Sequence, residues 1–264
     1  MGREALLKGG AHGPAIVPGK PDASLLILAV RQQGELKMPP GAKLSPEEVA
    51  TLTEWVKDGA VWGTKLGAGE LWKFDRIDQL GGHPTKVLGN PRVIDTEGGK
   101  AVAFNGKDEA LFVDWHPLAG AEVFTWEVIF RPDPDGNKEQ RFFHLQEDGS
   151  QNRMLFEIRI AGDRWYLDSF INSATGSRTL MNRGHQHPFG QWYHAATVYD
   201  GREMRNYVDG VQENAGDVKL APQKQGRSSA GVRINLVDYY KGAIAVSRFT
   251  RRALTPEEFL RAPK

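Results

Sequence analysis

The feature that most constrains the fold of this chain is a series of short apolar runs that begins at Leu71 and continues almost to the C-terminus. Runs such as Phe124–Phe130 and Met154–Ile160 are rich in aromatic and β-branched residues, which favour strands. Turn dipeptides such as Asn105–Gly106 and Asp209–Gly210 separate the runs, and such pairs are the preferred two-residue hairpin turns. Many short strands joined by tight turns indicate an antiparallel sandwich or barrel.

The apolar runs also predict which side chains form the core. We expect strands at residues 101–104, 110–113, 124–130, 142–145, 154–160, 165–167, 192–199, 204–208, 232–236 and 243–249. Side chains alternate between the two faces of a strand, so Trp126 in the core places Glu127 outside, and Phe156 in the core places Glu157 outside. The residues expected to be buried are Trp126, Phe130, Phe156, Val198 and Val208. We further expect one charged outer face that carries Glu127, Arg131, Glu157 and Arg159.

The composition excludes several classes of function. Of the 264 residues, 34 are Lys or Arg and 33 are Asp or Glu, so the formal charge is +1. This balance lacks the basic excess that phosphate contacts with nucleic acid require, and it predicts no nucleic-acid partner. The chain has no Cys, which excludes disulfides, catalytic thiolates, zinc thiolate sites and covalent attachment of haem c.

Helical signals precede the strand pattern. Residues 3–8 and 25–30 read as short helical segments, and Ser45, Pro46 and Glu48 form the N-cap, first-turn Pro and capping box of a helix start. We expect a small helical unit at residues 1–63, a Gly-rich linker at residues 64–69 and the sandwich at residues 70–264. The longest apolar run, residues 25–30, is far too short to span a membrane, and no signal peptide follows Met1. Because the chain begins inside an amphipathic segment, we expect it to be part of a longer protein.

Three segments of the strand region carry a family resemblance. They are the paired strands of residues 191–210, the strand, turn and strand of residues 101–111, and the last strand with its closing helix at residues 244–259. The N-cap, Pro and Glu pattern of residues 255–260 predicts that this closing element is a short terminal helix. Residues 70–264 resemble the laminin G-like domains of the concanavalin A-like lectin and glucanase superfamily. The resemblance implies a mainly β fold, an antiparallel jelly-roll sandwich of two sheets, preceded here by the small N-terminal helical unit.

The helical unit carries a second resemblance. Through Arg3–Leu7, Pro18–Pro21 and Leu36–Pro40, residues 3–62 resemble the C-terminal part of the planctomycete-type cytochrome c domain. That resemblance implies Met38 as the axial sulfur ligand of haem iron, but the CxxCH motif that attaches haem is missing, so we expect no haem c in this chain. Met38 is instead expected to pack against Trp55. The side chains predicted to pack against the sandwich in place of haem are Leu25, Leu28, Val49, Leu52 and Trp55.

The resemblance leaves a binding module and a hydrolase as alternatives. Glucanases of the superfamily carry Glu-x-Asp-x-x-Glu on one strand, whereas here Glu127 is followed by Ile129 and Pro132 at the two later positions. A glycan-active hydrolase would have to combine Glu127 with Glu157 across a groove. Salt bridges of these residues to neighbouring arginines would favour binding. We therefore predict a non-catalytic module that binds carbohydrate or protein. The alternatives are a glycan-active hydrolase, or a haem-binding electron-transfer protein if the parent protein contains the missing upstream half of the cytochrome c domain.

Candidate ligand and metal residues follow from the same resemblance. Family members bind glycans on the concave face and its rim loops through polar and aromatic side chains, and the candidates here are Arg131, His144, Arg159, Tyr166 and Tyr207. Many relatives hold a calcium ion with Asp side chains and loop carbonyls, for which the candidates are Asp75, Asn105 and Asp108. Both resemblances imply an exported bacterial parent protein, located in the periplasm or outside the cell.

Overall fold

The computed structural model describes residues 3–10, 12–57, 59–60 and 69–263. The chain divides into two compact units, Met1–Ala68 and Gly69–Lys264. Of the linker predicted at residues 64–69, only Gly69 belongs to the described residues. None of the described helices is long and apolar enough to cross a membrane.

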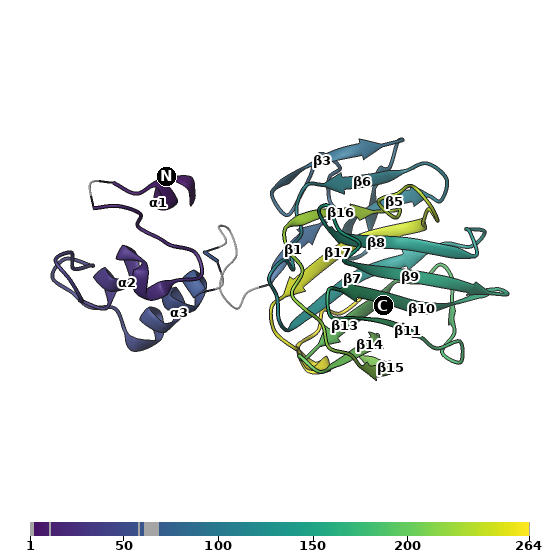
Figure 1. The fold of residues 1–264 in the computed structure, drawn as a ribbon. Coiled ribbons are helices and arrows are strands. Elements are labelled where there is room, and N and C mark those ends of the chain that lie inside the picture. Colours follow the sequence, from purple (N-terminus) through teal and green to yellow (C-terminus); the bar gives the residue numbers. More distant parts are fainter. Residues whose placement is uncertain (1–2, 11, 58, 61–68, 264) are drawn as a thin grey trace. The chain divides into compact units, whose positions relative to one another are not determined.

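The first unit contains three short helices, α1 (Arg3–Lys8), α2 (Leu25–Val30) and α3 (Pro46–Lys57), with a 3-10 turn at Pro21–Ala23 (Figure 1). The predicted capping box of α3 is present. The backbone N–H of Glu48 donates to Ser45 Oγ at 3.2 Å, and the backbone N–H of Ser45 donates to Glu48 Oε2 at 2.8 Å. Reciprocal capping of this kind satisfies two donors that a helix start leaves free.

A small apolar cluster holds this unit together. Its buried members are Ile16, Ile27, Val56 and Ala60. Leu52 and Trp55 pack against this cluster within the unit. The expectation that these side chains also pack against the sandwich stays a prediction. The side chain of Met38 is 49% exposed, which contradicts the prediction that it packs against Trp55.

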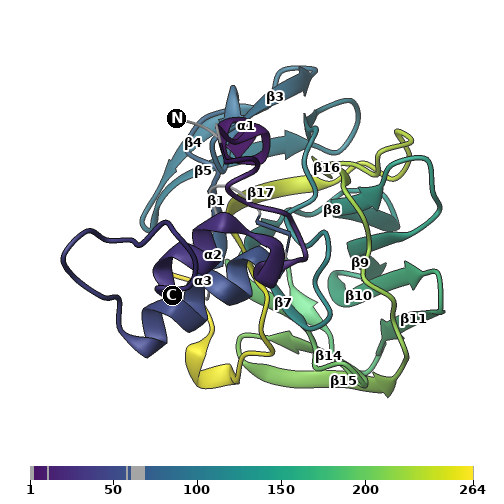
Figure 2. The ribbon, with the colours of Figure 1, turned by 60° about the vertical axis from the view of Figure 1, so that its left-hand side comes forward.

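The second unit is an antiparallel sandwich of two sheets (Figures 1 and 2). Sheet 1 has the order β15-β14-β13-β7-β17-β5-β4, with β1 also paired to β17. Its strands are β1 (Glu70–Lys73), β4 (Arg92–Thr96), β5 (Gly99–Asn105), β7 (Phe124–Pro132), β13 (Tyr193–Tyr199), β14 (Glu203–Val208), β15 (Val211–Asp217) and β17 (Lys241–Thr250). The predicted fold class is confirmed.

Sheet 2 has the order β11-β10-β9-β8-β16-β6-β3-β2, with β12 also paired to β10. Its strands are β2 (Gln79–Leu80), β3 (His83–Leu88), β6 (Ala110–Val113), β8 (Glu139–Glu147), β9 (Arg153–Ala161), β10 (Arg164–Ser173), β11 (Gly176–Met181), β12 (His187–Pro188) and β16 (Gly226–Ala230). Residues 232–236, predicted as a strand, instead form a turn in which Leu236 has a φ of 63°, a left-handed conformation that no strand contains. The strand lies just before it, at β16, where a Gly and two Ser gave no strand signal.

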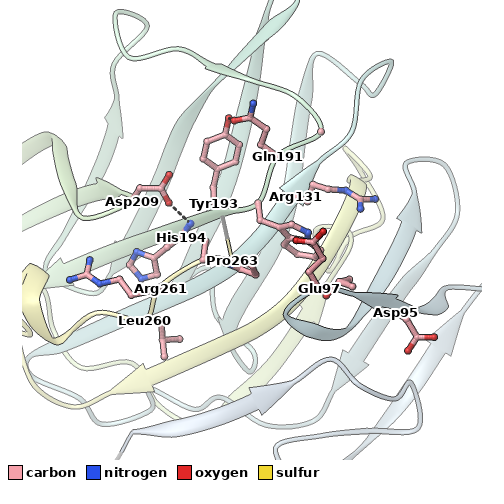
Figure 3. Close-up of a pocket in the computed structure, with 14 residues that line it drawn as sticks. Asp95, Glu97, Arg131, Gln191, Tyr193, His194, Asp209, Leu260, Arg261 and Pro263 are labelled. Atoms are coloured by element: carbon pink, nitrogen blue, oxygen red, sulfur yellow. Dashed lines mark hydrogen bonds between the residues drawn. The ribbon is translucent and has the colours of Figure 1, made fainter.

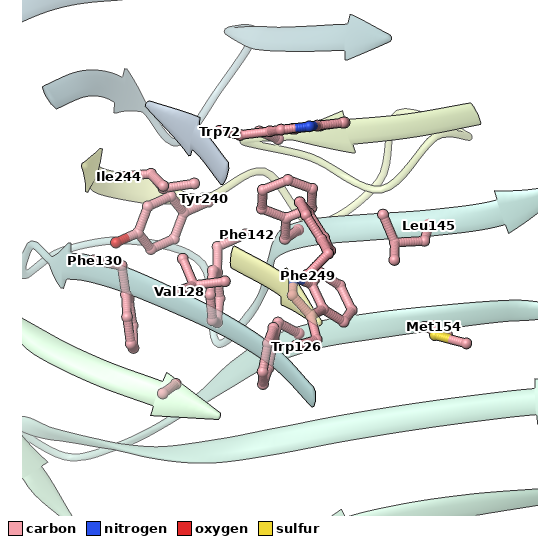
Figure 4. Close-up of a cluster of buried hydrophobic side chains, with 14 of the residues drawn as sticks. Trp72, Trp126, Val128, Phe130, Phe142, Leu145, Met154, Tyr240, Ile244 and Phe249 are labelled. Atoms are coloured by element: carbon pink, nitrogen blue, oxygen red, sulfur yellow. The ribbon is translucent and has the colours of Figure 1, made fainter. Parts of the chain in front are cut away.

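Aromatic side chains fill the space between the sheets (Figure 4). Phe130 stacks on Phe142 with ring centroids 4.4 Å apart, and Trp126 lies 4.5 Å from Phe156. Each of these pairs joins β7 of sheet 1 to a strand of sheet 2. Trp126, Phe130, Phe156, Val198 and Val208 are all buried, as predicted.

The C-terminal segment covers part of the outer face of sheet 1. Leu254 and Phe259 pack against Val198 and Tyr207 in a cluster separate from the main core. Thr125 Oγ1 on β7 accepts the backbone N–H of Leu254 at 2.8 Å. Sheet 1 is therefore buried on both faces where this segment crosses it, and outward polar side chains such as Thr125 and Glu127 are buried beneath it. The terminal helix expected at residues 255–260 is a shorter 3-10 turn, Pro256–Glu258.

Candidate functional site

The predicted charged face is divided between the two sheets. Glu127 and Arg131 lie on β7 in sheet 1, whereas Glu157 and Arg159 lie on β9 in sheet 2. The sheets pack through the faces that carry their aromatic residues, so the outward side chains of β7 and β9 point away from each other. The alternation within each strand is as predicted, but the single charged face is wrong because the strands belong to different sheets.

A wide hollow lies on the outer side of sheet 1, and we name it the Trp192 cleft (Figure 3). Its volume is about 870 Å³, within the range of about 300–1,000 Å³ usual for small-molecule sites. The residues that line it lie on or next to β4, β7, β13 and β14 and in the C-terminal tail, among them Asp95, Glu97, Arg131, Trp192, Asp209 and Arg261. The cleft thus brings together segments that are far apart in the sequence.

Arg131 and Trp192 form one wall of the cleft. The guanidinium carbon of Arg131 lies 5.5 Å from the ring centroid of Trp192, a cation–π distance. Arg131 Nε also donates to Asp133 Oδ1 at 2.9 Å, which fixes the guanidinium over the ring. Trp192 keeps part of its surface exposed toward solvent. Arg131 is therefore a predicted ligand residue that the structure places in a hollow.

A buried, hydrogen-bonded pair of side chains lies at the floor of the cleft. His194 is 1% exposed and Glu127 is fully buried, and His194 Nε2 lies 3.0 Å from Glu127 Oε1. Burial opposes the charge of Glu127, but hydrogen bonds from His194, Arg248 and the backbone N–H of Leu260 lower its pKa below the ordinary value. The carboxylate can only accept, so His194 Nε2 carries the hydrogen. Glu127 is therefore occupied in tying the C-terminal tail to β7.

A second, smaller hollow lies on the outer side of sheet 2. Its volume is about 150 Å³, and we name it the Arg153 basin. The charged residues that line it are Arg141, Arg153, Glu157, Arg159, Asp168 and Arg233. Arg141 Nε donates to Glu157 Oε1 at 2.9 Å, and Arg159 Nε donates to Asp168 Oδ2 at 2.8 Å. Burial and the neighbouring charge of Asp168 raise the pKa of Glu157.

Glu127 and Glu157 do not form a hydrolytic pair. They lie on the outer sides of different sheets, so they do not face each other across a common groove. Each is paired with arginine: Glu127 with Arg248, and Glu157 with Arg141 and Arg159. Hydrolysis of a glycosidic bond needs two carboxyl groups on the two sides of one bond. The arrangement that the hydrolase alternative required is therefore absent, and arginine pairing is the outcome expected of a binding module.

The remaining predicted ligand residues do not gather in one site. Tyr166 is partly exposed and lies opposite Arg159 on the outer side of sheet 2. His144 is 1% exposed, and its Nδ1 accepts the backbone N–H of Ile234 at 3.0 Å. Tyr207 is 7% exposed, packs under the C-terminal segment and donates to Gln212. The prediction that His144 and Tyr207 face a ligand is therefore wrong, because both side chains are buried. The turn at Ile234 covers His144, and the C-terminal segment covers Tyr207, which the strand pattern does not reveal.

The residues proposed for calcium are engaged with each other or with the backbone. Asn105 Nδ2 donates to Asp108 Oδ1 at 2.7 Å, and Asn105 Oδ1 accepts the backbone N–H groups of Lys107 and Asp108. Asp75 takes no part in these contacts, and its charge acts on Arg76 and Lys100. Throughout the described ranges, no group of three or more His, Cys, Asp or Glu side chains could hold a metal ion.

Sequence reasoning missed most of the Trp192 cleft. Trp192 was included in a predicted strand, but it precedes β13, and Asp209 was read only as part of a turn dipeptide. The backbone N–H of His194 donates to Asp209 Oδ1 at 2.8 Å, which places the turn at the edge of the cleft (Figure 3). Arg261 comes from the C-terminal tail. No sequence pattern indicates that Trp192, Asp209 and Arg261 line the same cleft.

The solved structures that share the fold of this chain include the following three. Domain 4 of AbnA, a GH43 extracellular arabinanase from Geobacillus stearothermophilus, solved in complex with arabinotriose, is 20% identical with a TM-score of 0.54, and the match covers 72% of this chain and 97% of that one. The receptor-binding domain of botulinum neurotoxin D is 12% identical with a TM-score of 0.55, covering 73% and 51%. The binding domain of Paraclostridial Mosquitocidal Protein 1 is 11% identical with a TM-score of 0.55, covering 72% and 50%. At these identities the likeness establishes the fold alone.

Comparison with families distinguishes the two units. None of the curated proteins matches the chain. The family of planctomycete cytochrome C matches residues 2–41, the segment whose resemblance pointed to Met38, although the chain has no Cys to attach a haem. The family model described as the concanavalin A-like lectin/glucanases superfamily, of laminin G type, matches residues 104–259, more than half of the chain. Together with the two-sheet fold, this match shows that the chain belongs to the concanavalin A-like lectin/glucanases superfamily.

Proposed function

We propose that the sandwich is a non-catalytic module that binds a glycan in the Trp192 cleft. The observation that carries this proposal is the cleft itself, a hollow of about 870 Å³ that combines a partly exposed indole ring with carboxylate, amide and guanidinium groups. Sugars offer hydroxyl groups that both donate and accept, and apolar ring faces that pack on aromatic side chains. A hollow with both kinds of group fits such a ligand.

The polar groups of the cleft are held in place, which favours recognition over chemistry. Arg131 is fixed by Asp133, and Asp209 accepts the backbone N–H of His194. A site whose side chains are already positioned loses less conformational entropy when a ligand binds. Glu127 beneath the floor is sealed by His194 and Leu260 and is not available to a ligand. The solved arabinanase domain in complex with arabinotriose supports a glycan rather than a protein as the ligand.

A glycan array on the full chain, followed by calorimetric titration of the best ligand, tests the proposal. We expect Trp192→Ala to weaken binding about five- to tenfold, because a lost aromatic contact costs about 1–1.5 kcal/mol. Tyr166→Ala is the matched control, since it removes a partly exposed aromatic from the other sheet. Loss of binding in the Tyr166 variant with none in the Trp192 variant would contradict the choice of cleft.

Two finer points belong to the same proposal. The array is run with and without calcium, because the family resemblance implies an ion near Asp75, Asn105 and Asp108. A higher affinity for glycan in the presence of calcium would support a calcium site there. We also propose that the parent protein is periplasmic or extracellular, as expected of a module for glycans outside the cell. Sequencing upstream of Met1 tests this: an in-frame leader supports export, and an immediate stop codon argues against it.

A further inference from the structure

The guanidinium groups of the Arg153 basin divide into two kinds. Arg141 and Arg159 are neutralised by carboxylates, since Arg141 pairs with Glu139, Glu157 and Asp238, and Arg159 pairs with Glu139, Glu157 and Asp168. Arg153 and Arg233 line the same hollow, yet within the described residues neither forms an ion pair. One end of the basin is therefore an ion-pair network, and the other end is cationic.

Arg153 is positioned but not neutralised. Its guanidinium carbon lies 4.7 Å from the ring centroid of Phe170, and its Nη1 donates to the backbone oxygen of Gln151 at 2.9 Å. Its Nε is buried and has no hydrogen-bond partner. Burial and the nearby charge of Arg233 lower the pKa of Arg153. A buried N–H of a charged group without a partner is rare, because it costs the full desolvation of that group.

His144 adds no further positive charge at this end. Burial and the charges of Arg233 and Arg153 lower the pKa of His144 well below its ordinary value, so it stays neutral, and its Nε2 has no hydrogen-bond partner. Arg233 is held close by the turn at residues 232–238, which is tied to β8 by the backbone N–H of Arg141 donating to Asp238 at 2.9 Å. Two guanidinium groups, of which that of Arg153 is held by Phe170 and Gln151, thus line the hollow without an ion-pair partner among the described residues.

A hydrogen-bond acceptor lies at the opposite end of the basin. Asp168 is 1% exposed, its Oδ2 accepts from Arg159 Nε, and its Oδ1 is buried without a partner. Asp168 and Glu157 face each other across β10 and β9. A ligand that fills the basin therefore meets free N–H groups at one end and a free carboxylate oxygen at the other. A simple inorganic anion would satisfy only the first of these.

We propose that the Arg153 basin is a second ligand site and that it takes a uronate, a sugar that carries a carboxylate. The carboxylate lies against Arg153 and Arg233, whose planar forks match its two oxygens. A ring hydroxyl donates to Asp168 Oδ1. This site goes beyond the proposed glycan site and does not depend on it, because the Trp192 cleft lies on the other sheet.

The test is an NMR titration of the ¹⁵N-labelled full chain with D-glucuronate, acetate and D-glucose. We expect glucuronate to shift the amide signals of Arg153 and Phe170 on β9 and β10, and to bind at least tenfold more tightly than acetate or glucose. Signals of Tyr193 and His194 on β13 report the Trp192 cleft separately. Failure of one site is thereby distinguished from failure of the other.

Paired substitutions assign the contacts. The double variant Arg153→Gln and Arg233→Gln should weaken glucuronate binding at least tenfold, and Arg233→Lys, which keeps the charge but not the fork, should weaken it less. Arg202→Gln is the control, because the side chain of Arg202 is 84% exposed and lies outside the basin. An unchanged spectrum of the free double variant shows that it folds. The proposal is overturned if glucuronate leaves β9 and β10 unshifted, if acetate binds equally well, or if the folded double variant binds as the unchanged chain does.

Discussion

The two outer faces of the sandwich are built from the same strand pattern, yet one is covered by another segment of the chain and the other carries an open hollow. On sheet 1 the outward Glu127 is covered by the C-terminal segment and pairs with His194, Arg248 and the Leu260 backbone. On sheet 2 the outward Glu157 lies in a network of arginines at the edge of a hollow. The difference shows that alternation decides which side of a sheet a residue faces, whereas a distant segment decides whether that side is buried.

The comparison is tested most severely by removing each carboxylate. Glu127→Ala leaves the buried His194 without its acceptor and removes the carboxylate partner of the partly exposed Arg248, and breaking a buried pair costs about 3–5 kcal/mol. Glu157→Ala should cost clearly less, since Arg141 keeps Glu139 and Asp238, and Arg159 keeps Asp168. Urea unfolding curves of the two variants measure both values. Equal losses would mean that cover by the C-terminal segment adds nothing to the pair on sheet 1.

The buried histidines sharpen the comparison through pH. His194 on sheet 1 has a carboxylate partner, whereas His116 bonds to the neutral Gln223 at 2.9 Å, and burial lowers the pKa of His116 from 6.5 to about 4. Between pH 6.5 and about 4, His116 therefore binds a proton in the unfolded chain but not in the folded chain. The contribution of neutral His116 is complete above pH 6.5 and is lost as the pH falls toward 4, by about 3 kcal/mol in total.

The measurement is the free energy of unfolding between pH 6.5 and 5, where ionised carboxyl groups contribute least to the slope. His116→Gln should remove about 2 kcal/mol of the decline over this interval. His12→Gln is the control, because His12 is exposed in the helical unit. A decline that His116→Gln leaves unchanged would contradict the assignment, and it would point to His144, whose pKa burial also lowers.

The smallest effect is expected at the wall of the Trp192 cleft. Arg131→Gln removes a cation–π contact with Trp192 and an ion pair with Asp133, both partly exposed, so the loss of stability should be about 1 kcal/mol or less. Thermal unfolding and the glycan titration are measured on the same variant. A large fall in stability would contradict this expectation. It would show that Arg131 supports the fold of sheet 1 and does not serve mainly as a hydrogen-bond donor for a ligand in the cleft.

The sequence predicted much of the fold, because the signals involved are local. The Ser45 and Glu48 capping box and the alternation of β7 and β9 depend on neighbours within a few residues, and all are present as expected. The strand predicted at residues 232–236 failed for the opposite reason. Residues 232–236 instead form a turn that is tied to β8 by the backbone N–H of Ile234 donating to His144, and that tie joins residues far apart in the sequence.

The sequence by itself determined that this chain is an antiparallel β-sandwich without cysteine chemistry, and it identified which side of each main strand faces the core. Only the tertiary structure decided that Glu127 and Glu157 belong to different sheets, that His144 and Tyr207 are covered, and that Arg153 and Arg233 share a hollow. The physical reason is that sheet order depends on which strands pair over long separations, as β7 does with β17. Side-chain periodicity carries no information about that pairing.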